Sequence, residues 1–285
     1  MVQSYLTDDA LLGLLASNPA EHENGPSVLE STMRCARRVR LDAEQSAVGA
    51  DMGSSDVLTA SSEARNIGTI THKLMELHHL GHDVTAYVPR EHPHPALSSQ
   101  LDEAWRLFDR YVAAFPAAFW GELVAAEVRL QGALGGQLLS GRIDAIWNMD
   151  AETVARVENR FACALNGPGR YLWDLKTATA KDSNLVAKWE WHPAPFQYLF
   201  LDGANDPRGM IFFQGVRLVS KSKVEPFQAA CLPADMVLSV DGQRRFEGML
   251  KRAETARLND EANCRACYDW YRICNHKQTG ACQGY

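Results

Sequence analysis

The chain has 285 residues, of which 46% are hydrophobic and 22% are charged, and this balance is typical of a globular protein with a buried core. No apolar segment is long enough to cross a membrane, and residues 1–24 lack the basic start of a signal peptide, so we expect a cytoplasmic protein without membrane contact. The net charge of −6 does not favour a nucleic-acid-binding protein, although it leaves room for a local basic patch.

The first part of the chain is expected to be helical. Helices are expected at residues 28–41, 62–80 and 100–115, and residues 50–62, which are small and polar, are expected to form a loop. The second helix has apolar residues at helical spacing, namely Ile67, Ile70, Leu74 and Leu77. The third helix has a similar core stripe, namely Leu101, Trp105, Phe108, Val112 and Phe115.

Beyond residue 120 the apolar pattern changes to that of strands. Strands are expected at residues 123–130, 138–149, 171–177, 210–218 and 224–232, with a short additional strand at 154–157. Gly132, Gly135 and Gly136 indicate a hairpin between the first two strands. Helices are expected at residues 195–202 and 233–258, the latter with a kink at Gly242. This order of elements predicts an α/β or α+β core.

Two acidic residues and a lysine lie on neighbouring expected strands. Asp144 ends residues 141–144 (Gly-Arg-Ile-Asp), and Asp174 and Lys176 belong to residues 174–177 (Asp-Leu-Lys-Thr). Because side chains alternate along a strand, we expect Asp174 and Lys176 to share one face and Asp144 to face away from both of its neighbours. Two carboxylates can hold a divalent cation, and an ammonium beside them can orient a water or balance charge on a phosphate. The pattern therefore favours metal-dependent phosphodiester cleavage.

These motifs resemble a known family when two further segments are added. Gly68, Thr69, His72 and Glu76 lie on the expected helix at 62–80, and Gln197 lies in a later helical segment. With residues 141–144 and 174–177, they resemble the PD-(D/E)XK nuclease superfamily in its RecB-like branch, from about residue 28 to residue 274. The resemblance implies an α/β fold with a restriction-endonuclease-like central mixed sheet flanked by helices.

The resemblance also implies the residues of a metal site. The ligands of Mg²⁺ or Mn²⁺ would be His72, Asp144, Asp174 and the carbonyl of Leu175. Lys176 would orient or activate a water at that site.

Further residues lie at positions that the family uses around this site. Gln197 would support the site and contact DNA. The family often has a tyrosine four residues later, where this chain has Leu201, and Tyr198 is an alternative for that position. Glu127 lies on the preceding strand, where the family often has an acid, and we interpret it as an ordinary charge on a strand face.

The cysteines near the C-terminus have the spacing of a metal site. Three thiolates would come from Cys264, Cys267 and Cys274. Cys35 is expected as the fourth ligand, and Cys282 is the alternative to either Cys35 or Cys274. Thiolates suit Zn²⁺ or a [4Fe–4S] cluster, and resemblance to the iron–sulfur subgroup of the branch, which includes CRISPR-associated adaptation exonucleases, favours the cluster. Cys163 and Cys231 are interpreted as packing residues.

The cluster would join the two ends of the chain. The expected organisation is an N-terminal extension at residues 1–25 and a nuclease domain at residues 26–285, in which residues 26–45 and 259–285 form the cluster region. Arginines and aromatic residues in this region would hold single-stranded DNA by phosphate contact and stacking. We therefore expect a DNA exonuclease acting on single strands or frayed ends. The alternatives are a non-catalytic DNA-binding or assembly module that retains the nuclease fold, and a zinc-stabilised endonuclease. A helicase or recombination partner would be a separate protein, because the chain has no Gly-x4-Gly-Lys-[Ser/Thr] motif.

Overall fold

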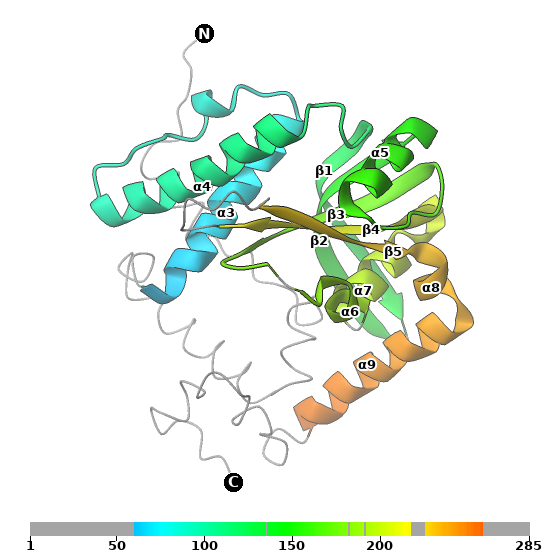
Figure 1. The fold of residues 1–285 in the computed structure, drawn as a ribbon. Coiled ribbons are helices and arrows are strands. Elements are labelled where there is room, and N and C mark those ends of the chain that lie inside the picture. The colour runs from blue at the N-terminus through cyan, green and yellow to red at the C-terminus, as the bar shows by residue number, and fades with distance from the viewer. Residues whose placement is uncertain (1–59, 135, 182, 191, 218–225, 259–285) are drawn as a thin grey trace.

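The computed structural model describes residues 60–258 apart from residues 135, 182, 191 and 218–225 (Figure 1). These residues form an α/β fold in which a five-stranded mixed sheet is flanked by helices. The strand order, β1-β2-β3-β4-β5, follows the order of the chain. Within the described ranges, no helix combines the length and the hydropathy that a membrane span requires.

The mixed character of the sheet comes from one crossover. β1 (Glu122–Leu134) and β2 (Gln137–Met149) form the expected antiparallel hairpin, and β3 (Gly169–Ala178) pairs antiparallel with β2. β4 (Pro207–Val216) runs parallel to β3, because two helices cross over between them. β5 (Phe227–Pro233) pairs antiparallel with β4. The five main strands expected from the sequence are confirmed, with ends that differ by a few residues.

Within the described residues, three helices cover the first face of the sheet. They are α3 (Ala60–His79), α4 (Pro95–Ala114) and α5 (Ala151–Phe161), and a 3-10 turn, η2 (Val84–Ala86), follows α3. The core on this face is strongly aromatic, with Tyr111, Phe115, Trp120, Trp147, Trp173 and Phe213 all buried. The expected apolar stripe of α3 is buried, whereas Val112 of α4 is 40% exposed and lies outside the core.

In the part of the chain that the structure describes, four helices cover the opposite face. They are α6 (Leu185–Glu190), α7 (Pro193–Leu201), α8 (Ala234–Leu238) and α9 (Val240–Leu258), with a 3-10 turn, η3 (Gly203–Asn205), after α7. Figure 1 places α7, α8 and α9 on the side of the sheet opposite α3 and α4. The sheet is therefore covered on both faces, which explains why the central strands are apolar on both sides.

Residues 154–157 are helical, and the expectation of a strand there was wrong. They lie within α5, whose first turn is capped by Asp150, because its side chain accepts a hydrogen bond from the Thr153 amide at 2.8 Å. Val154 and Val157 are three residues apart and face the core from one side of the helix. The apolar residues within 154–157 are too few to distinguish the buried face of a helix from a strand.

The helix expected at residues 233–258 is two helices, α8 and α9. The break lies at Ser239, which has an extended backbone, and its hydroxyl accepts a hydrogen bond from the Gly242 amide at 3.0 Å. Gly242 is not a kink, but it has a steric role, since an added Cβ there would lie 2.1 Å from the Val237 carbonyl oxygen. A serine N-cap thus begins α9 where the sequence suggested a kinked continuous helix.

Cys163 and Cys231 form a disulfide, which corrects their interpretation as separate packing residues. Cys163 follows α5 and Cys231 lies in β5, and their Cα atoms are 6.0 Å apart across 68 residues of sequence. The two cysteines meet because α5 packs against β5 on the first face of the sheet. The other five cysteines lie outside the described residues, so the expected metal cluster stays a prediction.

Candidate metal centre

The centre of the site is an irregular rung of the β1–β2 hairpin, where a rung is a pair of residues that face each other across the two strands. Ala126 pairs with Ala145 and Val128 pairs with Ile143, so Glu127 stands opposite Asp144. Glu127 has a φ of 51°, in the left-handed region that non-glycine residues rarely adopt and that costs roughly 1 kcal/mol or more. Such strain in the middle of a strand is more frequent at functional sites than elsewhere.

The alternation of β2 is also broken at this rung. Ile143 packs in the core of α6–α9, whereas Ala145 packs in the core of α3–α5. In a regular strand these two residues would face the same side. Our expectation that Asp144 faces away from two like-oriented neighbours was therefore wrong, and the irregularity helps to turn the Asp144 carboxylate towards α3.

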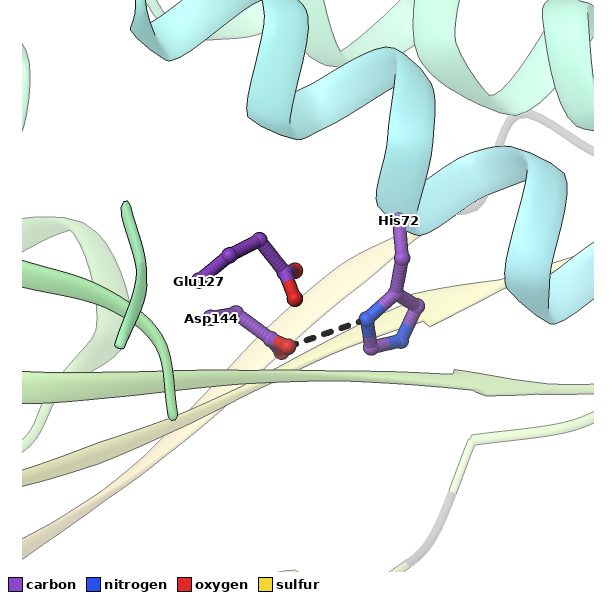
Figure 2. Close-up of side chains that lie close together, drawn as sticks. All are labelled: His72, Glu127 and Asp144. Carbon is purple, nitrogen blue, oxygen red and sulfur yellow. Dashed lines mark hydrogen bonds and ion pairs between the residues drawn. The ribbon is translucent and has the colours of Figure 1, made fainter. Parts of the chain in front are cut away.

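His72 of α3 completes the central group. Its Nδ1 lies 3.1 Å from Asp144 Oδ1, and one ligand atom from each of His72, Glu127 and Asp144 lies within 4.8 Å of the others. Figure 2 shows the two carboxylates side by side, facing the imidazole. An imidazole nitrogen and two carboxylate oxygens at this spacing are suitable ligands for a divalent cation such as Mn²⁺.

The His72–Asp144 pair determines the charge state of both residues. Burial acts to lower the pKa of His72, but the charge of Asp144 and its hydrogen bond outweigh burial, and the pKa lies above its ordinary value. Burial acts to raise the pKa of Asp144, but the opposite charge of His72 and its hydrogen bond, with Lys176 and the backbone of Leu175, bring it below the ordinary value. Asp144 is therefore a carboxylate at neutral pH.

Leu175 contributes a backbone donor to the site. Its amide N–H donates to Asp144 Oδ2 at 2.6 Å and joins β3 to the irregular rung of β2. The metal role of the Leu175 carbonyl, which the family resemblance implies, stays a prediction.

Asp174 and Lys176 form an ion pair beside the central group. Lys176 Nζ lies 2.7 Å from Asp174 Oδ2, and the Asp174 side chain is only 3% exposed, whereas that of Lys176 is 41% exposed. Burial raises the pKa of Asp174, Lys176 opposes the increase, and the nearby charge of Asp144 adds to it. The charge of Asp144 thus affects the pKa of Asp174, although the Asp174 oxygens are not part of the three-residue group.

Glu127 is the member of this group that the sequence interpretation left out. Burial raises its pKa to about 7, the Asp144 charge adds to this effect, and Arg142 opposes it from 2.9 Å, between Arg142 Nε and Glu127 Oε2. A carboxyl group with such a raised pKa among other acids is typical of a cation site or an active site. The acid that the family often has at this position was the available signal.

Two glycines of the sequence motifs allow close packing around the site. A Cβ on Gly141 would lie 2.4 Å from Cε1 of Tyr198, and a Cβ on Gly68 would lie 3.2 Å from the Thr177 hydroxyl oxygen. Gly141 therefore lets α7 approach β2, and Gly68 lets α3 approach the end of β3. These contacts fix the helices that carry or support the site.

Gln197 and Tyr198 both join α7 to β2. Gln197 is fully buried, and its Nε2 donates to the Ser140 carbonyl at 2.7 Å. The Tyr198 hydroxyl donates to the Arg142 carbonyl at 3.0 Å. Because the Gln197 side chain has no exposed surface, these bonds favour a positioning role over the direct contact with DNA that we expected.

Comparison with known proteins leaves the family open. No family model matches the chain, and no curated protein matches it. Among solved structures, the crystal structure of SSO0001 is similar over 99% of this chain and 98% of its own, with 15% identical residues and a TM-score of 0.45. At this TM-score the similarity assigns neither a fold family nor a function.

Proposed function

We propose that the protein is a metal-dependent deoxyribonuclease of the RecB-like PD-(D/E)XK type, with a restriction-endonuclease-like sheet, that hydrolyses phosphodiester bonds in single-stranded DNA or at frayed ends. The observation that carries the proposal is the convergence of His72, Glu127 and Asp144, with the Asp174–Lys176 pair beside them. These residues come from one helix and three strands, and a group of this kind has no evident use in stabilising the core, because like charges repel each other.

The ligand set fits Mg²⁺ or Mn²⁺. Asp144 and Glu127 would provide carboxylate oxygens, His72 would provide a nitrogen that Mn²⁺ accepts more readily than Mg²⁺, and Asp174 would complete the acidic group. A divalent cation bound here would supply Lewis acidity to the phosphodiester and lower the pKa of a nearby water.

Lys176 is proposed as the residue that contacts the attacking water or the phosphate. Its side chain is partly exposed, and its ammonium is aligned by buried Asp174, so it can orient an attacking water or stabilise the charge on the phosphate. Gln197 and Tyr198 would act at a distance by holding the β2 backbone on which Asp144 lies.

A [4Fe–4S] cluster bound by Cys35, Cys264, Cys267 and Cys274 is part of the proposal, with Zn²⁺ as the alternative metal. It rests on the cysteine spacing and on the resemblance to the iron–sulfur subgroup, since these residues lie outside the described ranges. The expected DNA contacts of the terminal segments, a separate helicase or recombination partner, and a cytoplasmic location remain proposals from the sequence.

The proposed activity is tested with an end-labelled linear single strand in Mg²⁺, Mn²⁺ or EDTA. We expect cleavage with either metal, none with EDTA, and a loss of several orders of magnitude in Asp174→Ala, because this change removes a carboxylate of the acidic group. Asp109→Ala is the matched control, since Asp109 is an exposed residue of α4 paired with Arg90, and it should retain wild-type activity.

Three outcomes of this assay would contradict the proposal or part of it. Wild-type activity in Asp174→Ala would reject the assigned site. Tight DNA binding by a folded protein without cleavage in either metal would indicate a non-catalytic DNA-binding module. Cleavage of a covalently closed circular strand as fast as the linear strand would reject the requirement for a free end.

A further inference from the structure

Each carboxylate of the site is paired with its own basic side chain. Asp144 is paired with His72, Asp174 with Lys176, and Glu127 with Arg142, at 3.1, 2.7 and 2.9 Å respectively. The first two bases have roles in the proposed function, as a ligand and as the residue that meets the substrate. Arg142 has none, although its contact occupies an oxygen of the acid that has the strained backbone.

The Arg142 side chain is open to solvent, whereas its backbone is held by a hydrogen bond. The side chain is 54% exposed, whereas that of Glu127 is 21% exposed. The Arg142 carbonyl accepts the Tyr198 hydroxyl at 3.0 Å, and its strand neighbour across the ladder is Arg129. The guanidinium is therefore a solvent-accessible positive charge at the edge of the site, carried by a residue whose backbone is hydrogen-bonded.

A metal cation and the Arg142 guanidinium would compete for the Glu127 carboxylate. Arg142 Nε lies 2.9 Å from Glu127 Oε2, on the carboxylate that faces His72 and Asp144. Two positive charges on one carboxylate repel each other, so each lowers the affinity of Glu127 for the other.

We infer that Arg142 is an exchangeable counter-ion of Glu127: it neutralises this acid in the metal-free protein, leaves it when a divalent cation binds, and then pairs with a backbone phosphate of the DNA strand. The inference rests on the proposed function and adds a residue to it. A guanidinium matches the geometry of phosphate oxygens, and an arginine already desolvated on one side at the site entrance is well placed to bind them.

The first test measures Mn²⁺ affinity by calorimetry on the full chain without DNA. Arg142→Met should bind Mn²⁺ roughly two- to fivefold more tightly than wild type, because a competing partner of Glu127 is lost. Arg129→Met removes the same charge from the adjacent position of the ladder and should change the affinity less. Glu127→Gln should bind Mn²⁺ more weakly than wild type.

The second test measures binding of a fluorescent phosphorothioate oligothymidylate with and without Mn²⁺. Mn²⁺ should tighten binding by the wild type more than by Arg142→Met, because only the wild type releases a guanidinium for the phosphates. An Mn²⁺ affinity of Arg142→Met equal to that of wild type or Arg129→Met would overturn the inference alone. A folded wild type that does not bind Mn²⁺, or a Glu127→Gln variant that binds it equally well, would overturn the proposed metal site and the inference with it.

Discussion

At the scale of single residues, His79 lies in surroundings that keep its ring neutral. The Trp120 indole donates to the Tyr111 hydroxyl at 2.8 Å, and this hydroxyl lies 2.8 Å from His79 Nε2. An indole can only donate, so the Tyr111 hydroxyl accepts from Trp120, and its own proton remains available for a bond to an unprotonated Nε2 of His79. The ring also packs edge-on against Trp147 and Trp173. Burial, with a smaller effect of neighbouring charge, lowers the pKa of His79 to about 3, so its ring is neutral at neutral pH.

This lowered pKa predicts a pH dependence of stability. The unfolded chain binds a proton at His79 below about pH 6.5, whereas the folded chain does not until about pH 3, so the free energy of unfolding falls as the pH decreases through this window. Between pH 7 and pH 5, wild type should lose about 2 kcal/mol more than His79→Gln, which keeps an acceptor without a titrating ring. Urea unfolding at both pH values measures this difference. Equal losses in the two proteins would show that the folded chain protonates His79 normally.

The residues of the site were predictable from the sequence only in part. His72 and Asp144 were expected together, and they are in contact. Asp174 and Lys176 were expected on one strand face, and they form an ion pair. Glu127 was not expected in the group, because the left-handed backbone that turns its carboxylate inwards is a tertiary feature and glutamate carries no local signal for it.

At the scale of secondary-structure elements, the approach of α7 to β2 depends on the absence of a side chain at Gly141. The Tyr198 ring occupies the space next to it and is anchored through its hydroxyl to the Arg142 carbonyl. The ring is nearly buried, so it has little room to move away. The contact links the backbone of β2 next to Asp144 to the packing of a whole helix.

Gly141→Ala should therefore destabilise the protein. The added Cβ would lie 2.4 Å from Tyr198 Cε1, and overpacking of this kind costs about 1–3 kcal/mol. Gly248→Ala is the matched control, because Gly248 lies within α9 and an added Cβ there meets nothing within 4 Å. The control should be neutral or gain up to about 1 kcal/mol from helix propensity. Denaturant unfolding compares the two, and a Gly141→Ala protein as stable as the control would show that α7 adapts freely.

The errors at this scale have local causes. The helix α5 was mistaken for a strand because Val154 and Val157 are too few to establish a period, and the cap at Asp150 was overlooked. The break between α8 and α9 depends on the serine cap at Ser239. Short capped helices are therefore less predictable from apolar spacing than the long helices α3 and α4.

At the scale of the whole molecule, the α/β class followed from the sequence because long amphipathic helices and apolar strands have different periods. The hairpin could also be predicted from the sequence, because glycines separate its two strands. The Cys163–Cys231 disulfide was not, because it depends on the approach of two elements separated by 68 residues. The terminal cysteines lie outside the described part of the chain, and their cluster remains a prediction from spacing.

The central claim is that His72, Glu127 and Asp144 together hold a divalent cation, and anomalous diffraction from crystals of the full chain containing Mn²⁺ tests it most directly. The account predicts an anomalous peak within about 2.5 Å of one atom from each of these three side chains, since direct ligands of such cations lie at this range. Saturating Mn²⁺ with no peak at these residues, and with the His72–Asp144 hydrogen bond still in place, would contradict it.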